Sequence, residues 1–170
     1  MHPKTLTHQL GLCSYVLERN LRELSEQESH VAPDTGGSCI NWVLGHITRT
    51  RLALLRALGR ELPFPMEEFD AYDDRGGVPF TRETAIPLDK LKRRYKALQE
   101  PLVRALNQLP EGIMEQPAQF SPTGNPKETM GTLLAAFAFH EAYHAGQTGV
   151  LRRVAGKEGA IKPPAAATVA

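Results

Sequence analysis

Residues 133–151 read LLAAFAFHEAYHAGQTGVL and lie in the longest stretch without proline in this chain, residues 127–162. Large apolar residues, two histidines and a threonine recur there every three or four residues, the spacing of positions along one face of an α-helix. They are Leu133, Leu134, Phe137, His140, His144, Thr148 and Leu151. Just upstream, Asn125 is suited to cap a helix, Pro126 to its first position and Glu128 to its first turn. The sequence therefore predicts a long helix that starts at Asn125 and carries two histidines on its core-facing side.

Three further segments show the same spacing, and each is bounded by proline, which ends or kinks a helix interior. The 13 prolines of the chain leave residues 4–32, 34–62 and 88–100 free of proline. The expected core faces are Leu6, Leu10, Cys13, Leu17, Leu21 and Leu24 in the first helix, Ile40, Val43, Leu44, Ile47, Leu54, Leu55 and Leu58 in the second, and Leu88, Leu91, Tyr95, Leu98, Leu102 and Leu106 in the third. Pro101 falls inside the third pattern and predicts a kink.

Four helices and almost no alternating, strand-like sequence predict an all-α fold, a four-helix bundle in which helices pack on helices. Two long crossover loops join the helices, residues 60–86 and 108–125, and loops of this length often form a lid or a pocket wall, or else are mobile. Ser38 is expected to cap the second helix. Gly59 and Gly156 are expected to end the second and fourth helices, where the chain needs a left-handed residue.

The composition narrows the classes of function. The chain has 170 residues, and 20 basic and 19 acidic side chains give a net charge of +1. This length fits one domain, which we place at residues 1–156, followed by a peripheral C-terminal tail, residues 157–170. A nearly neutral chain is poorly suited to neutralise phosphates, so no nucleic-acid partner is expected.

Two cysteines, Cys13 and Cys39, are too few for a disulfide framework or a cysteine zinc site. The N-terminal residues lack the apolar core of a signal peptide, and no apolar run is long enough to cross a membrane. We therefore expect a cytoplasmic protein without a membrane partner. Cys13 lies on the apolar face of the first helix and is expected to act as a small core side chain.

His140 and His144 are four residues apart, so a helix places their imidazoles one turn apart on one face. Because both fall on the apolar stripe, each ring needs a partner to offset its lost hydration. Hydrogen bonds to backbone or hydroxyl groups are one interpretation. A metal ion, bound by both rings, is the other.

Glu141 completes the sequence His-Glu-Ala-Tyr-His, which matches the H-E-x-x-H pattern of zinc peptidases. Those enzymes take a third ligand from farther downstream, but the 26 residues after His144 contain no histidine and one acid, Glu158. A di-iron site would need a second Glu-x-x-His unit, and the sequence has none. The peptidase interpretation is weak and the di-iron one fails, so a third ligand is better sought upstream.

His46 lies on the second expected helix, beside its core stripe, in the segment Trp42-Val43-Leu44-Gly45-His46. Together with His-Glu-Ala-Tyr-His-Ala-Gly-Gln at residues 140–147, this segment resembles the DinB family of four-helix-bundle metalloenzymes. The likeness spans residues from about 5 to 155. In that family a Trp-x-x-Gly-His segment supplies one histidine and a His-x-x-x-His-x-Gly-Gln segment supplies two. Ala145 is smaller than the residue common at its position in the family.

The resemblance implies that His46, His140 and His144 bind one divalent ion, with zinc or nickel favoured and iron or manganese compatible. Three imidazoles leave an open coordination position, as in catalytic sites. Members of the family include transferases and isomerases that use low-molecular-weight thiols, and such bundles commonly form homodimers. The resemblance thus implies activation of a thiol or water against a small electrophilic substrate. A non-enzymatic bundle that binds a metal or ligand is the alternative.

Other side chains near these motifs have less specific interpretations. Glu141 is a candidate general base, or a partner of a ligating ring, and Gln147 is a neighbouring acceptor by helical spacing. Trp42 is expected to be a packing residue rather than a pocket wall. The arginines of the second helix are expected to form a solvated face, with binding of an acidic co-substrate as the alternative; they are Arg49, Arg51, Arg56 and Arg60. No chemistry is assigned to His2, His8 or His30.

Overall fold

The computed structural model describes residues 3–161, and these form helices and loops with a single isolated β-bridge, between Pro117 and Thr129. The all-α class is thereby confirmed. In chain order the elements are α1 (Pro3–Asn20), α2 (Glu26–Ser29), α3 (Ile40–Ala57), the 3₁₀ helix η1 (Met66–Tyr72), α4 (Leu88–Ala97), α5 (Gln99–Asn107), the 3₁₀ helix η2 (Ile113–Glu115) and α6 (Met130–Val154).

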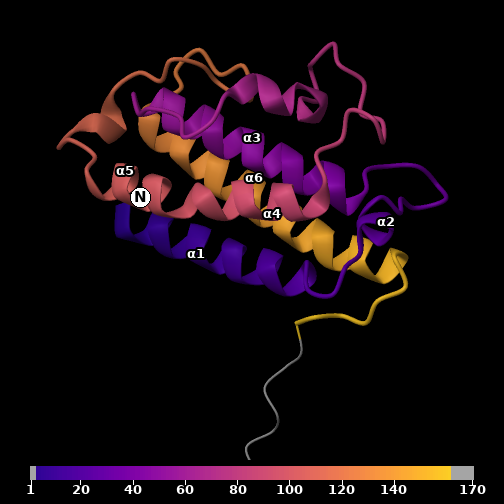
Figure 1. The fold of residues 1–170 in the computed structure, drawn as a ribbon. Helices are drawn as coiled ribbons and strands as arrows, with labels where there is room; N and C mark the ends of the chain where they lie inside the picture. The colour runs from indigo at the N-terminus through magenta and orange to yellow at the C-terminus, as the bar shows by residue number, and fades with distance from the viewer. Residues whose placement is uncertain (1–2, 162–170) are drawn as a thin grey trace, which may run out of the picture.

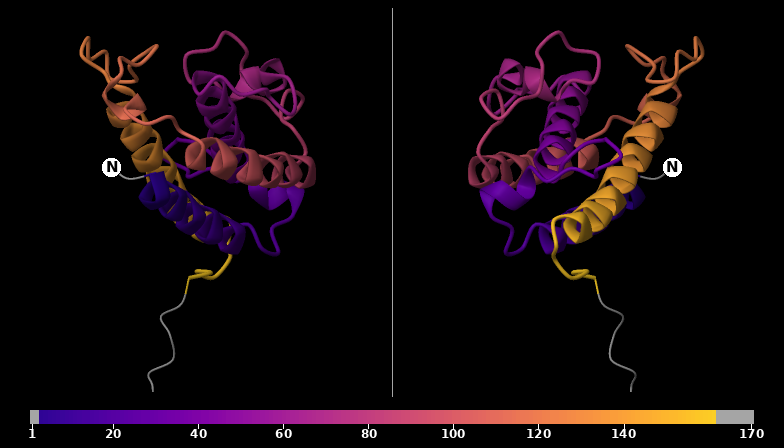
Figure 2. Two further views of the ribbon diagram at one scale, coloured as in Figure 1. Left: turned by 90° about the vertical axis from the view of Figure 1, so that its left-hand side faces the viewer. Right: turned by 90° about the vertical axis from the view of Figure 1, so that its right-hand side faces the viewer.

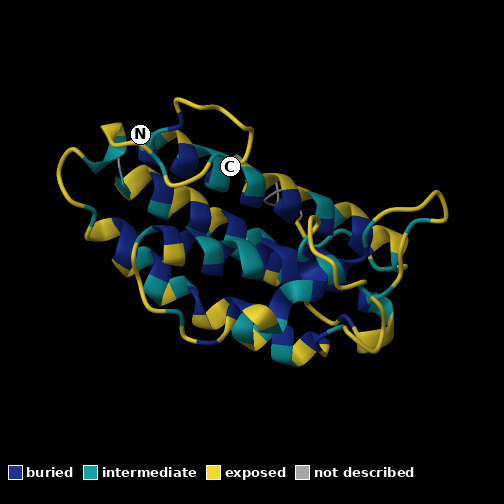
Figure 3. Cartoon of the chain, turned by 90° about the horizontal axis from the view of Figure 1, so that it is seen from above, coloured by how far each residue is buried: buried dark blue, intermediate teal, exposed yellow. Residues whose placement is uncertain are grey.

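The long helices surround one apolar core (Figure 1). Helix α1 lies beside α6 and also contacts α5, whereas α3 packs against α6, α4 and η1 (Figure 2). Leucines dominate the core because each helix turns its apolar stripe inward, while exposed residues lie on the outer faces and along the long loops (Figure 3). Helices α3 and α6, which carry the histidine motifs, are therefore direct neighbours.

Helix α6 begins later than the expected start at Asn125. Its N-cap is Thr129, whose hydroxyl accepts from the backbone N–H of Thr132. The backbone just before the cap is already paired in the β-bridge region, because Ala118 N–H donates to the carbonyl of Glu128. A helix from Asn125 would lose that pairing. The side chain of Asn125 instead accepts from the N–H of Lys127 in a local turn.

The first helix ends at Asn20, so Leu21 and Leu24 are buried without being helical, contrary to the expected pattern. The short helix α2 was not expected from the sequence. It is capped by Ser25, whose hydroxyl accepts from Glu28 N–H while the Glu28 carboxylate accepts from Ser25 N–H. This reciprocal cap stabilises a helix of four residues, which is too short to show a periodic pattern of apolar residues.

The third expected helix is broken into α4 and α5 at Leu98. The kink expected from Pro101 is confirmed, and it falls one turn before the proline. The pyrrolidine ring has no N–H and collides with the carbonyl of the residue four positions earlier, Ala97, so the break appears there. Tyr95 and Gln99 lie on either side of the break, in α4 and α5.

The expected start of α3 differs from the observed one, whereas the expected ends of α3 and α6 are confirmed. Cys39 rather than Ser38 is the N-cap, and its side chain makes no capping hydrogen bond, so the expectation for Ser38 was wrong. Gly59 follows the C-cap of α3 with φ +66°, and Gly156 follows that of α6 with φ +80°, as expected for helix-ending glycines.

The loop over residues 60–86 is partly structured. Its 3₁₀ helix η1 packs on α3 and buries Phe69 and Tyr72 completely. The loop over residues 108–125 contains η2, which packs on α6. Of the expected tail, only residues 157–161 are described; the rest lies outside the described residues, and the domain boundary stays a prediction.

Candidate metal centre

His46 is held from two sides on α3. The Trp42 ring, one turn earlier, stacks on the imidazole with ring centroids 4.7 Å apart and planes 11° apart. The Nδ1–H of His46 donates to the backbone carbonyl of Tyr72 over 2.9 Å. Since a carbonyl can only accept, this bond places the proton on Nδ1 and leaves Nε2 with a free lone pair.

Gly45 explains how Tyr72 comes so close to α3. A Cβ at position 45 would lie 2.0 Å from the Tyr72 ring, far inside van der Waals contact. The ring is fixed at its other end as well, because the Tyr72 hydroxyl donates to Asn41 Oδ1 and accepts from the N–H of Ile86. The absence of a side chain at Gly45 thus lets η1 place a carbonyl beside His46.

His140 and His144 project from α6 one turn apart, with ring centroids 4.4 Å apart. The Nδ1–H of His144 donates to Oε1 of Gln147 over 2.8 Å, an acceptor provided by the same helix. His144, like His46, therefore carries its proton on Nδ1 and presents a lone pair on Nε2. Sequence spacing alone had placed Gln147 within reach.

The three Nε2 atoms converge on one point. His140 Nε2 lies 2.9 Å from His46 Nε2 and 3.1 Å from His144 Nε2, and the three atoms lie within 4.8 Å of one another. Two lone pairs face His140 Nε2, and one proton there can satisfy only one of them. A cation among the three nitrogens satisfies all of them, and a tetrahedral zinc site needs N···N separations of about 3.4 Å, close to those present.

Burial keeps the rings of His140 and His144 in the form that binds metal. His46 and His144 are each only 9% exposed. Burial, together with the neighbouring His144 and His46, lowers the pKa of His140 to about 4, and burial also lowers the pKa of His144. The imidazoles of His140 and His144 are therefore neutral at pH 7 and can ligate without first losing a proton.

The ring of His140 differs from the other two because its Nδ1 is buried without a hydrogen-bond partner. A buried nitrogen with no partner costs free energy. The donor set fits a three-imidazole metal site. The rings of His46 and His144 are oriented by acceptors of the chain, and the ring of His140 is not.

Glu141, the candidate base, is placed away from this group of nitrogens. Both of its carboxylate oxygens bind the guanidinium of Arg51, and Oε1 also accepts from the Tyr95 hydroxyl. Arg51 is 1% exposed, so the expectation that it lies on a solvated face was wrong. A base role for Glu141 stays a prediction.

The two cysteines lie in the core. Burial raises the pKa of the Cys13 thiol to about 11, and burial raises that of Cys39 as well. Both thiols are therefore protonated near neutral pH and poorly nucleophilic. This agrees with the expected structural role of Cys13.

Trp42 packs on His46, as expected. It also lines a cavity of about 340 Å³, so it is a pocket wall as well. The cavity is lined by His30, Ala32, Gly37, Ser38, Cys39, Trp42 and Phe80. Phe80 belongs to the long loop after η1, as expected for a loop that forms a pocket wall. His30 stacks on Phe80 and contacts Glu26, and it takes no part in the histidine cluster.

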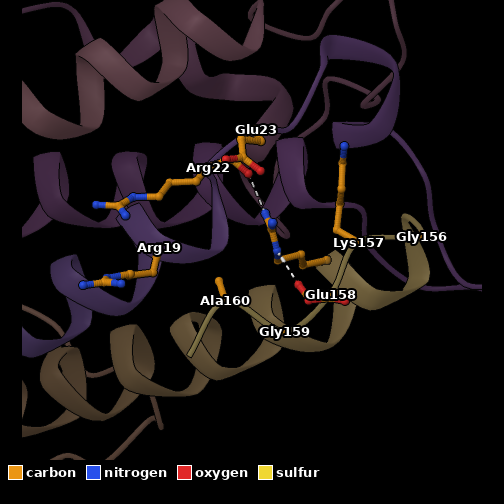
Figure 4. Close-up of a pocket in the computed structure, with 9 residues that line it drawn as sticks. Arg19, Arg22, Glu23, Gly156, Lys157, Glu158, Gly159 and Ala160 are labelled. Atoms are coloured by element: carbon orange, nitrogen blue, oxygen red, sulfur yellow. Dashed lines mark hydrogen bonds between the residues drawn. The ribbon is translucent and has the colours of Figure 1, made fainter. Parts of the chain in front are cut away.

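A larger cavity, of about 470 Å³, lies where the chain leaves α6 (Figure 4). Its buried arginine, Arg152, donates to the carbonyls of Asn20, Arg22 and Glu158. These bonds satisfy the carboxyl end of α1 and hold residues 156–160 against it. Arg152 is eight residues beyond His144, or about 12 Å along the helix, so this cavity is separate from the histidine cluster.

A helical bundle with three histidines converging from two adjacent helices defines a candidate metal-binding protein. Residues 9–148 match the family model of the DinB superfamily. The chain therefore belongs to the DinB superfamily, as the two histidine motifs indicated. Searches of curated proteins and of solved structures found no match to this chain. Among residues 3–161, no helix combines the length and apolar character needed to cross a lipid bilayer.

Proposed function

We propose that this chain binds one divalent metal ion through His46, His140 and His144, and that it is an enzyme whose reaction depends on this ion. Zinc or nickel is favoured, and iron or manganese is compatible with the same donors. The observation that carries the proposal is the convergence of three Nε2 atoms, two of which have no proton. Three neutral protein ligands leave at least one coordination position for a small molecule.

A bound divalent ion would lower the pKa of a thiol or water and could polarise an electrophile. The chain's own residues prepare that position. Tyr72 and Gln147 fix the orientation of two ligating rings through their Nδ1–H groups, and Trp42 covers one face of His46.

The favoured reaction is transfer to a thiol supplied from solution. The sulfur forms a bond to an electrophilic carbon, the leaving group departs with its electron pair, and the thiol proton passes to solvent. A low-molecular-weight thiol suits this chain because both of its own thiols are buried and have raised pKa values. The cytoplasm, where such thiols stay reduced, is the proposed location. The cavity beside Trp42 and Phe80 suits an apolar or aromatic part of a small substrate.

Turnover by the loaded protein tests this proposal. Untagged protein loaded with zinc or nickel is mixed with glutathione, bacillithiol or mycothiol and a chromogenic aryl halide, and parallel assays offer an activated ester for hydrolysis by water. We expect a rate above the uncatalysed one that disappears on chelation and in a His46→Ala variant. A metal-replete protein with no metal-dependent rate in any of these assays would favour the non-enzymatic alternative.

We also propose that two copies of the chain associate through the outer face of α6. Phe139, Tyr143 and Val150 are 73%, 61% and 59% exposed, and their spacing places them on one side of the helix. Residues 133–151 contain no Asp, Lys or Arg, and their single Glu, Glu141, is buried. The solvated side of an ordinary surface helix is polar, so this uncharged apolar stripe suits an isologous contact with a second copy.

Sedimentation velocity tests this contact. The wild-type protein is expected to be a dimer and Val150→Glu a monomer, because the substitution buries an unpaired charge in the contact. Val78→Glu, at an exposed apolar loop residue that is 43% accessible, is the matched control and should remain dimeric. A monomeric wild-type protein, or a Val150→Glu variant that dimerises as tightly, would contradict the proposed interface.

A further inference from the structure

A network of buried and half-buried polar side chains crosses the bundle and takes one residue from each of its long helices. Its members are Ser14 on α1, Arg51 on α3, Tyr95 on α4, Gln99 on α5 and Glu141 on α6. The Arg51 guanidinium is the hub of the network. It binds the Glu141 carboxylate, donates to Gln99 Oε1 over 2.8 Å and to Ser14 Oγ over 2.9 Å, and stacks over the Tyr95 ring at 4.1 Å.

The contact between Arg51 and Glu141 has two prongs. Nε of Arg51 donates to Oε2 of Glu141 over 2.9 Å, and Nη2 donates to Oε1. Such a planar pair fixes direction as well as distance, because both hydrogen bonds form only in one relative orientation. It therefore constrains both the rotation of α6 about its axis and its position along α3.

This pair lies on the two helices that carry the histidines. Arg51 follows His46 by five residues on α3, about 7.5 Å along the axis, and Glu141 lies between His140 and His144 on α6. A rotation or slide of α6 that broke the pair would also carry His140 and His144 away from His46. The geometry of the ion pair and the geometry of the three nitrogens are coupled through rigid helices.

Stability alone is a poor explanation for such a pair. Arg51 is 1% and Glu141 4% exposed, so both charges have lost their hydration. Buried ion pairs are often no more stabilising than apolar side chains of similar volume, and their best-attested use is to specify one arrangement among alternatives.

We propose, on the basis of the metal site above, that Arg51 and Glu141 are positioning residues that set the register of α6 against α3 and so bring the three Nε2 atoms within reach of one ion. Glu141 in the His-Glu-Ala-Tyr-His motif then acts through Arg51 on the placement of both neighbouring histidines. The glutamate of this motif serves the geometry of the ligands, in contrast to its use as a base in zinc peptidases.

The test uses the double variant Arg51→Met with Glu141→Leu, which removes both charges together and leaves neither one buried alone. Co²⁺ is the probe, because its visible spectrum reports ligand number and geometry. We expect a folded variant whose metal-free melting temperature is close to that of the wild type, a Co²⁺ affinity lower by about 10- to 100-fold, and a changed Co²⁺ spectrum.

Asn20→Ala is the matched control. Asn20 is also a buried polar residue that binds α6, through the carbonyl of Ala145 and the hydroxyl of Thr148, but it joins α6 to α1 instead of α3. It should lower the melting temperature while leaving the Co²⁺ affinity and spectrum unchanged. A general loss of stability is thereby separated from a loss of positioning.

Wild-type Co²⁺ affinity and spectrum in the double variant would overturn the positioning role while leaving the metal site intact. Absence of Co²⁺ binding in the wild-type protein would overturn both proposals. If the double variant does not fold, Arg51→Lys decides, because it keeps the buried charge and loses the two-pronged contact. An altered Co²⁺ spectrum in Arg51→Lys supports the role, and an unaltered one contradicts it.

Discussion

Replacing His46 with alanine is expected to lower the affinity for Zn²⁺ by roughly 100-fold or more, because the site loses one of three ligands and the ring that Tyr72 and Trp42 hold in place. The expected cause is local. α3 keeps its apolar core face, so the variant should fold, and its far-ultraviolet circular dichroism should match that of the wild type. Competition with a chromophoric chelator measures the affinity.

His30→Ala is the control for this substitution. The His30 side chain is only 7% exposed and also has an aromatic partner, but it pairs with Glu26 and lies outside the cluster. Its removal should change the zinc affinity by less than about twofold. Equal affinity in wild type and His46→Ala would show that the ligand taken from α3 had been wrongly assigned.

Gly45→Ala is expected to destabilise the fold by about 3 kcal/mol and to impair metal binding, although it adds one methyl group. The new Cβ would overlap the Tyr72 ring, and that ring cannot retreat easily because it is fully buried and its hydroxyl is bonded to Asn41 and Ile86. Displacing Tyr72 also withdraws the carbonyl that orients His46. Thermal unfolding and zinc titration measure the two effects.

Gly11→Ala provides the comparison, since Gly11 lies inside α1 and an added Cβ there meets nothing within 4 Å. Alanine should stabilise that helix by up to about 1 kcal/mol. A Gly45→Ala protein with unchanged stability and zinc affinity would show that the contact between Tyr72 and α3 does not support the site. Partial recovery of stability in Gly45→Ala with Tyr72→Leu would identify the ring as the source of the clash.

Local periodicity was enough to predict most of the helices. The leucine spacing of α1 and the long apolar stripe of α6 are repeated over several turns, and Pro101 correctly indicated the break in the third helix. The start of α6 was misplaced because Asn125 and Pro126 form a local turn, and the residues after it pair with residues 116–118 of the same loop. A pairing between two parts of one irregular loop leaves no periodic pattern in the sequence.

The histidine cluster was found through its motifs, but its supports were only partly visible. Gln147 is three residues from His144, so helical spacing placed it within reach. Tyr72 is 26 residues from His46 and contributes a backbone carbonyl, which every residue possesses. No residue type therefore marked it in advance.

Arg51 shows the limit of reading charge as solvent exposure. It lies among other arginines on α3, where a solvated face was the natural interpretation. Its burial depends on a carboxylate 90 residues away, at Glu141, and on polar side chains from three other helices. Such a long-range partner emerges from the packing of the helices and is not encoded in the local pattern.

The metal content of untagged protein tests the central claim most directly. After exposure to Zn²⁺, Ni²⁺, Fe²⁺ or Mn²⁺ and removal of unbound ions, elemental analysis should find about one ion per chain for zinc or nickel, since the three imidazoles already lie close together. Less than about 0.2 ion per chain for every one of the four metals would contradict the assignment of His46, His140 and His144 as a metal centre.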